Sequence, residues 1–174
     1  MQGLSLQAII ALGSNMGQSI ETLTEALKAI NNIDGVTIVK ASSLYRTKPV
    51  GYLDQDDFIN AVIELEISIL PMDLYDNLAK IELDFGRVRL IKNGPRTLDL
   101  DVISCDNLLS DDPKLILPHP RAQERAFVIV PMSEIVPNHV FADSKLSVLQ
   151  VLAKLPVKDV QEIIKLEQNW AQIV

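Results

Sequence analysis

The sequence contains a single cysteine, Cys105, and this scarcity excludes two kinds of stabilising element. One thiol cannot form a disulfide within the chain, nor can it supply a metal site made of several thiolates. Long apolar runs are also missing. The apolar stretch at residues 6–12 is far shorter than the roughly 18 to 20 residues of a membrane span, and it lacks the basic flank and cleavage pattern of a signal peptide. We therefore expect a cytoplasmic protein that makes no use of a membrane.

Positive charge is scarce as well, with 16 lysines and arginines against 23 acidic residues and a net charge of −7. Such a chain has little long-range attraction to nucleic acid, and it carries no aromatic RNA-binding signature. A Walker loop, a glycine-rich dinucleotide fingerprint and a serine–histidine–aspartate order are all missing too. We expect small-molecule partners, no nucleic acid, and a nucleotide site, if there is one, of another design.

What is present suits a compact fold. The 174 residues are 48% apolar and 22% charged, values typical of soluble globular proteins. A chain of this length is commonly built around one core, and no repeat or linker divides it. We expect a single domain covering residues 1–174.

The apolar periodicity predicts an α+β fold. Alternating or continuous apolar patterns predict strands, and apolar residues spaced by three and four predict helices. The predicted strands cover residues 6–12, 36–47, 58–68 and 98–105, and the predicted helices cover residues 20–30 and 71–85. This order, βαββαβ, is that of ferredoxin-like sandwiches, so we expect a mainly antiparallel sheet with helices packed on it. Further helices are predicted near residues 126–135 and 146–155, whereas the pattern of residues 159–174 is ambiguous.

Two aspartates two residues apart are the first chemical signal. In a strand, this spacing sends Asp99 and Asp101 to one face and sends Leu98, Leu100 and Val102 to the other. Like charges side by side are unfavourable unless a cation compensates them, and carboxylate oxygens suit Mg²⁺. A solvated sheet face remains the alternative.

Immediately upstream, residues 86–97 carry three arginines, Arg87, Arg89 and Arg96, and no acidic residue. Arginine matches phosphate oxygens in a bidentate manner, and arginines facing magnesium-binding aspartates make the electrostatic arrangement that phosphoryl transfer needs. A solvated basic loop is the alternative. His119, held between two prolines, and the nearby Arg125 add further candidates for an anion site, whereas His139 has no supporting context.

The run Gly94-Pro95-Arg96-Thr97-Leu98-Asp99-Leu100-Asp101 closely resembles the signature of the 6-hydroxymethyl-7,8-dihydropterin pyrophosphokinase family. Other motifs follow in the family's order: Ala11-Leu12-Gly13-Ser14-Asn15, Tyr45-Arg46-Thr47, Phe58-Ile59-Asn60-Ala61, Ile81-Glu82, Gly86-Arg87-Val88-Arg89, and Leu117-Pro118-His119-Pro120-Arg121 with Arg125 and Phe127. The resemblance covers roughly residues 8–141.

The resemblance implies transfer of pyrophosphate from ATP to the pterin alcohol in folate biosynthesis, with release of AMP. It also implies that the protein acts as a monomer. By this resemblance two Mg²⁺ ions are bound by Asp99 and Asp101, and the catalytic residues are Arg87, Arg96, Asp99 and Asp101. The implied ATP-binding residues are Glu82, Arg87, Arg89, Arg96, Val102, His119 and Arg125. The implied pterin-binding residues are Thr47, Val50, Asn60 and Phe127.

Two alternatives stay open at this point. One is another magnesium-dependent phosphoryl or nucleotidyl transferase on the same fold. The other is a non-catalytic ferredoxin-like binding module, which the acidic charge disfavours if its ligand is RNA.

Overall fold

The computed structural model describes residues 5–49, 54–86 and 97–172. The strands are β1 (Leu6–Ser14), β2 (Val36–Ala41), β3 (Tyr45–Thr47), β4 (Phe58–Ile67), β5 (Asp99–Cys105), β6 (Ser110–Asp112), β7 (Leu115–Leu117) and β8 (Ile164–Lys165). The α-helices are α1 (Ser19–Asn31), α2 (Pro71–Asp84), α3 (Ala126–Ile135), α4 (Val148–Lys154) and α5 (Val157–Gln161), with one 3₁₀ turn at Ala122–Glu124. No helix within these ranges has both the length and the apolar character needed to cross a bilayer.

Six strands form one antiparallel sheet in the order β5-β1-β4-β3-β8, and β2 pairs with another part of β4. The long strands β1 and β4 lie at its centre, and their register places Gly13 opposite Asn60. Strands β6 and β7 make a separate hairpin. The predicted α+β class and the antiparallel sheet are confirmed.

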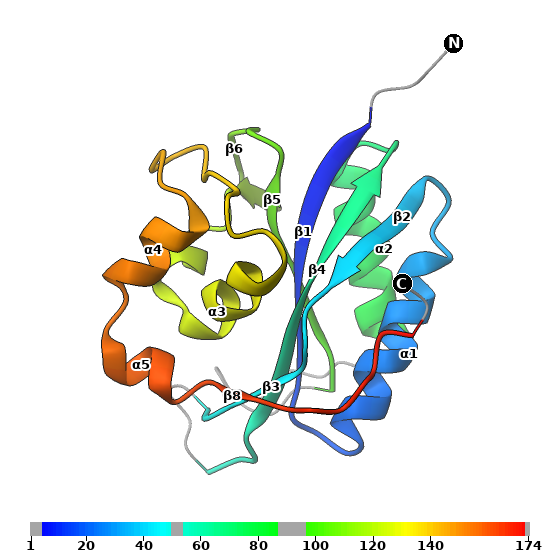
Figure 1. Cartoon of the computed structure of the whole chain (residues 1–174). Coiled ribbons are helices and arrows are strands. Elements are labelled where there is room, and N and C mark those ends of the chain that lie inside the picture. Colours follow the sequence, from blue (N-terminus) through cyan, green and yellow to red (C-terminus); the bar gives the residue numbers. More distant parts are fainter. Residues whose placement is uncertain (1–4, 50–53, 87–96, 173–174) are drawn as a thin grey trace.

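Helices cover both faces of the sheet, as Figure 1 shows. On one face, α1 and α2 pack their apolar side chains, such as Leu27 and Leu78, against Ile10 and Ile63 of the central strands. On the other face, α3 and α4 enclose a second cluster with Val62. Because side chains alternate along a strand, β1 and β4 supply both clusters from consecutive residues.

One predicted strand is wrong in its extent. Residues 36–47 form two strands, β2 and β3, that both pair with β4. Ser42 makes the break, because its backbone N–H donates to the carbonyl of Val62 and its hydroxyl accepts from the Val62 N–H at 2.9 Å. A side chain that hydrogen-bonds to the backbone of the neighbouring strand in this way competes with the regular backbone hydrogen bonds of the sheet.

The end of the chain, ambiguous from sequence, returns to the sheet. After the short helix α5, strand β8 pairs with β3. Trp170 is then buried, and its indole N–H donates to the carbonyl of Ser42 at 2.9 Å. The C-terminal segment thus closes the edge of the sheet at β3.

Candidate active site

A cavity of about 670 Å³ opens where β1 and β3 end and where β4 and β5 begin, on the face that α3 covers. This volume is within the usual range for small-molecule sites. The described residues that line it are Ala11, Leu12, Gly13, Thr47, Lys48, Phe58, Asn60, Asp99, Asp101, His119, Arg121, Glu124, Arg125, Ala126, Phe127, Val128, Asp159, Glu162 and Ile163.

Asp99 and Asp101 lie side by side at the start of β5, half-buried and on the cavity wall. Their neighbours Leu98, Leu100 and Val102 are buried in the cluster beneath α1 and α2. The alternation predicted for this strand is therefore confirmed. The two carboxylates bring hard oxygen donors to one place, which is the chemistry that Mg²⁺ prefers.

This aspartate pair does not make a closed metal cage. Within residues 5–49, 54–86 and 97–172, no group of three or more histidine, cysteine or acidic side chains is placed to hold a metal ion. Mg²⁺ commonly takes one or two carboxylates and completes its shell with water and substrate phosphates. The pair fits that pattern of binding, in which the substrate supplies the remaining ligands.

His119 lies near the aspartates, at the end of a cis Leu117–Pro118 peptide, and its backbone N–H donates to the carbonyl of Ile103 on β5. Burial lowers the pKa of His119, and the positive charges of Arg125 and Arg121 lower it further. The carboxylate of Asp99 has the opposite effect on this pKa. The ring is therefore neutral at pH 7. Because Nδ1 accepts the backbone N–H of Arg121 at 3.2 Å, the neutral ring carries its hydrogen on Nε2.

Arg125 and Phe127 flank the start of α3. The guanidinium carbon of Arg125 lies 5.5 Å from the centroid of the Phe127 ring, which is cation–π distance. Both residues are half-buried and line the cavity. Arg121, which is exposed, lines it as well. The cavity thus has cationic groups and an aromatic face next to each other.

A buried amide lies between the central strands. Asn60 donates from Nδ2 to the Thr47 hydroxyl at 2.7 Å, and both residues are buried. A methyl group at Gly13 would lie only 2.8 Å from Asn60 Oδ1, so the glycine makes room for the amide. Backbone register thus brings together residues 47 positions apart in the chain, Gly13 and Asn60, beside the cavity.

Two residues that the resemblance implied for ATP binding lie on the opposite face of the sheet. Val102 is buried in the cluster beneath α1 and α2. Glu82 is buried on α2, and its carboxylate accepts the backbone N–H of Leu100 at 2.7 Å. Neither is among the residues that line the cavity. Their nucleotide-binding role stays a prediction.

The remaining predicted site residues, Val50, Arg87, Arg89 and Arg96, lie outside the described residues. Conversely, the cavity is lined by residues that the sequence analysis did not select. Asp159, Glu162 and Ile163 reach it from the segment that follows α4. No motif marks them. The pairing of β8 with β3 and the packing of α5 near α3 place this segment at the cavity.

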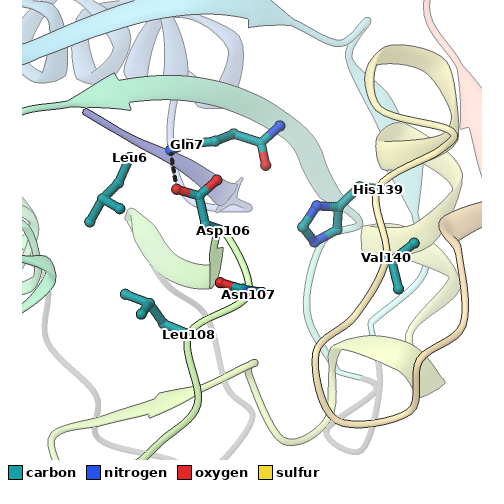
Figure 2. A pocket seen from close by; sticks show the side chains of 7 residues that line it. All are labelled: Leu6, Gln7, Asp106, Asn107, Leu108, His139 and Val140. Atoms are coloured by element: carbon teal, nitrogen blue, oxygen red, sulfur yellow. Dashed lines mark hydrogen bonds between the residues drawn. The ribbon is translucent and has the colours of Figure 1, made fainter. Parts of the chain in front are cut away.

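His139, the second histidine, belongs to a different depression of about 340 Å³ at the far end of β1 and β5 (Figure 2). There Asp106 accepts the backbone N–H of Gln7 at 3.2 Å, and the Ser104 hydroxyl lies 3.1 Å from His139 Nε2. Burial lowers the pKa of His139, while the carboxylates of Asp106 and Glu64 partly oppose it. This arrangement is separate from the cavity and supports the fold.

The lowered histidine pKa values predict how stability depends on pH. Between the lowered pKa and the ordinary 6.5, the unfolded chain binds more protons than the folded protein. The free energy of unfolding should therefore be greatest above pH 6.5 and fall as the pH decreases, by at most about 1.4 kcal/mol per pH unit for each histidine. Urea denaturation between about pH 5.5 and 7.5 measures this slope. A His139→Gln variant should show a shallower slope, and an unchanged slope would contradict the assignment.

Comparison with known proteins shows which family the sequence resembles. A model of the family described as 7,8-dihydro-6-hydroxymethylpterin-pyrophosphokinase (HPPK) matches residues 9–137. The chain is 43% identical over 141 residues to 2-amino-4-hydroxy-6-hydroxymethyldihydropteridine pyrophosphokinase of Haemophilus influenzae, covering 81% of this chain and 88% of the relative. The enzyme of the same name from Pseudomonas aeruginosa is 38% identical, with 88% of this chain and 94% of the relative covered.

A solved structure agrees in fold. Plasmodium falciparum HPPK-DHPS, wild type, with pterin and p-hydroxybenzoate, superposes with a TM-score of 0.70 at 12% identity. The match covers 88% of this chain but only 42% of that one, so this chain spans less than half of the solved chain. By its family-model match and by its relatives, the chain belongs to the 7,8-dihydro-6-hydroxymethylpterin-pyrophosphokinase family.

Proposed function

We infer that this protein transfers the pyrophosphoryl group of ATP to 6-hydroxymethyl-7,8-dihydropterin, producing the pterin diphosphate and AMP for folate biosynthesis. The observation that carries this inference is one cavity that holds an aspartate pair, a cationic group around Arg125 and a buried amide, Asn60. The aspartate pair suits the metal, the cationic group suits the triphosphate, and the amide suits the flat heterocycle of the acceptor.

For the triphosphate, we propose that His119 and Arg125 donate hydrogen bonds to phosphate oxygens. A neutral imidazole with hydrogen on Nε2 can donate there, and a guanidinium can donate from two nitrogens at once. Arg87, Arg89 and Arg96 are proposed to add further charge, and Glu82 and Val102 are proposed to support the nucleotide. These five assignments come from the family resemblance.

We propose that Asp99 and Asp101 hold two Mg²⁺ ions. When bound, the ions neutralise phosphate charge and fix the triphosphate for in-line attack. The chain's part is to present both carboxylates on one strand face, half-buried at the cavity wall.

For the acceptor, we propose that Asn60 and Thr47 recognise the polar edge of the pterin, that Phe127 stacks on its ring, and that Val50 contributes to the same pocket. Asn60 still has acceptor capacity at Oδ1, and a flat ring with amide-like edges is commonly held by stacking and paired hydrogen bonds.

The reaction balances without an added reactant. The acceptor oxygen forms a bond to the β-phosphorus and releases its proton to solvent, while the bond from the β-phosphorus to the oxygen retained by AMP breaks. Catalysis then rests on alignment of the two substrates, on a hydrogen bond from His119, and on charge neutralisation by Arg125 and the other arginines.

We also propose the finer description of the protein itself: one domain over residues 1–174, monomeric, with a ferredoxin-like sandwich as its core. The sheet order β5-β1-β4-β2 around α1 and α2 supports the last point.

The direct test combines purified protein with Mg²⁺, ATP and the pterin alcohol, and it measures AMP and the pterin diphosphate by chromatography. Both products should appear in equal amounts, and neither should form when the pterin or Mg²⁺ is omitted. Absence of AMP from the complete mixture would refute the proposal.

A Gly13→Ala variant tests the acceptor site by displacing the side chain of Asn60. The new methyl group would lie 2.8 Å from Asn60 Oδ1, so the amide must rotate and give up its bond to Thr47. We expect a loss of about 1 kcal/mol in the free energy of unfolding and a roughly 10-fold rise in the pterin Kd. Fluorescence titration with the pterin measures the second effect. In an Asn60→Ala background, Gly13→Ala should add nothing, and a full additional effect there would contradict the mechanism.

A further inference from the structure

We propose that the C-terminal segment, residues 157–170, forms a wall of the acceptor-binding half of the cavity, and that Glu162 and Ile163 determine how tightly the acceptor binds. This inference rests on the proposed function and extends it to residues beyond 9–137, the stretch that the family model matches. Both side chains line the cavity and both are half-buried.

The segment is firmly held along the sheet edge. Strand β8 pairs with β3 through Ile164 and Lys165, and the backbone N–H of Leu166 donates to the carbonyl of Leu44 at 2.9 Å. Trp170 then anchors the segment, because its side chain is only 6% exposed and bonds the Ser42 carbonyl. Figure 1 shows the segment in red, running from α5 along β3. A wall fixed at two points can preserve the shape of a binding site.

Strand order decides which half of the cavity this wall borders. In the order β5-β1-β4-β3-β8, β5 carries the aspartate pair at one edge, and the C-terminal segment forms the opposite edge. The register makes a continuous row across the sheet from Asp99 through Gly13, Asn60 and Tyr45 to Lys165. The buried amide Asn60 lies between the aspartates and the C-terminal segment. The segment therefore borders the side assigned to the acceptor rather than the metal.

The chemistry of the two side chains fits a flat heterocycle with N–H donors. Ile163 offers apolar contact to a ring, and the Glu162 carboxylate can accept hydrogen bonds from an amino edge. A carboxylate also repels phosphate, whereas Arg121 and Arg125, which like Asp99 lie close to His119, attract it. The wall thus favours the acceptor and disfavours misplaced triphosphate. Asp159 also lines the cavity, and its side chain is exposed.

Neighbouring residues of the same segment provide matched controls. Ile163→Ala is compared with Ile164→Ala, because Ile164 is 53% exposed and does not line the cavity. Glu162→Gln is compared with Glu167→Gln, whose side chain is exposed. Each variant is measured for the KM of the pterin alcohol, for kcat at saturation, for the Kd of a non-hydrolysable ATP analogue with Mg²⁺, and for Tm.

We expect Ile163→Ala to raise the pterin KM about 10-fold and Glu162→Gln to raise it about 5-fold, with kcat, nucleotide Kd and Tm nearly unchanged. Both controls should match the wild type. An unchanged pterin KM in Ile163→Ala and Glu162→Gln, with an active wild type, would overturn this inference alone. A wild type that releases no AMP would overturn the proposed function and this inference with it.

Discussion

An Asp101→Asn variant is expected to lose pyrophosphoryl transfer almost completely, with kcat lower by on the order of 10³-fold. Asp101 and Asp99 share one face of β5 at the cavity wall, and no cluster of three acidic, histidine or cysteine side chains within the described ranges offers a replacement site. The substitution keeps the size of the side chain but removes a charged oxygen donor. Steady-state assays of AMP release over a range of Mg²⁺ concentrations measure the effect.

The control for Asp101→Asn is Asp111→Asn, which makes the same chemical change at an exposed position in β6. That variant should keep wild-type activity. Thermal unfolding should show both variants folded, with Tm within a few degrees of the wild type, because changes at positions that are not fully buried usually alter stability little. Full activity of the Asp101→Asn variant would contradict the proposal that Asp101 binds Mg²⁺.

An Asn60→Ala variant is expected to weaken pterin binding by about 10- to 100-fold and to leave nucleotide affinity unchanged. The substitution removes a buried amide and leaves the Thr47 hydroxyl, which accepts from Asn60 at 2.7 Å, without this donor. Titration calorimetry with the pterin and, separately, with a magnesium–ATP analogue distinguishes the two affinities.

The matched control for Asn60→Ala is Asn77→Ala, which removes a half-buried amide on α2 that donates to the backbone carbonyl of Asp73. It should bind both ligands as the wild type does. If Asn60→Ala lost affinity for the nucleotide and kept it for the pterin, the division of the cavity into two halves would be wrong.

Periodic patterns were enough to predict the parts of the molecule that depend on local geometry. The face shared by Asp99 and Asp101 follows from the two-residue period of a strand, and burial of Leu98, Leu100 and Val102 on the other face confirms it. The helix from Pro71 to Asp84 follows in the same way from apolar spacing, with proline in its first turn. These predictions needed no knowledge of distant contacts.

Features that depend on pairing across the sheet could not be predicted in this way. The short strand β8 has two residues, both exposed, so it has no apolar alternation to detect. The contact of Gly13 with Asn60 depends on the register of β1 and β4, and the break at Ser42 depends on a bond to the backbone of Val62. Glu82 illustrates the same limit, because only the packing of α2 against β5 shows that its carboxylate bonds the Leu100 N–H.

The central claim is that the group transferred contains both the β- and γ-phosphates of ATP, and isotope tracing tests it most directly. Protein, Mg²⁺ and the pterin alcohol are incubated with ATP labelled either at the α- or at the γ-phosphorus, and the products are separated. We predict that the γ label appears in the pterin diphosphate and that the α label stays in AMP. Gamma label in a pterin monophosphate with ADP as co-product, or α label attached to the pterin, would contradict the account.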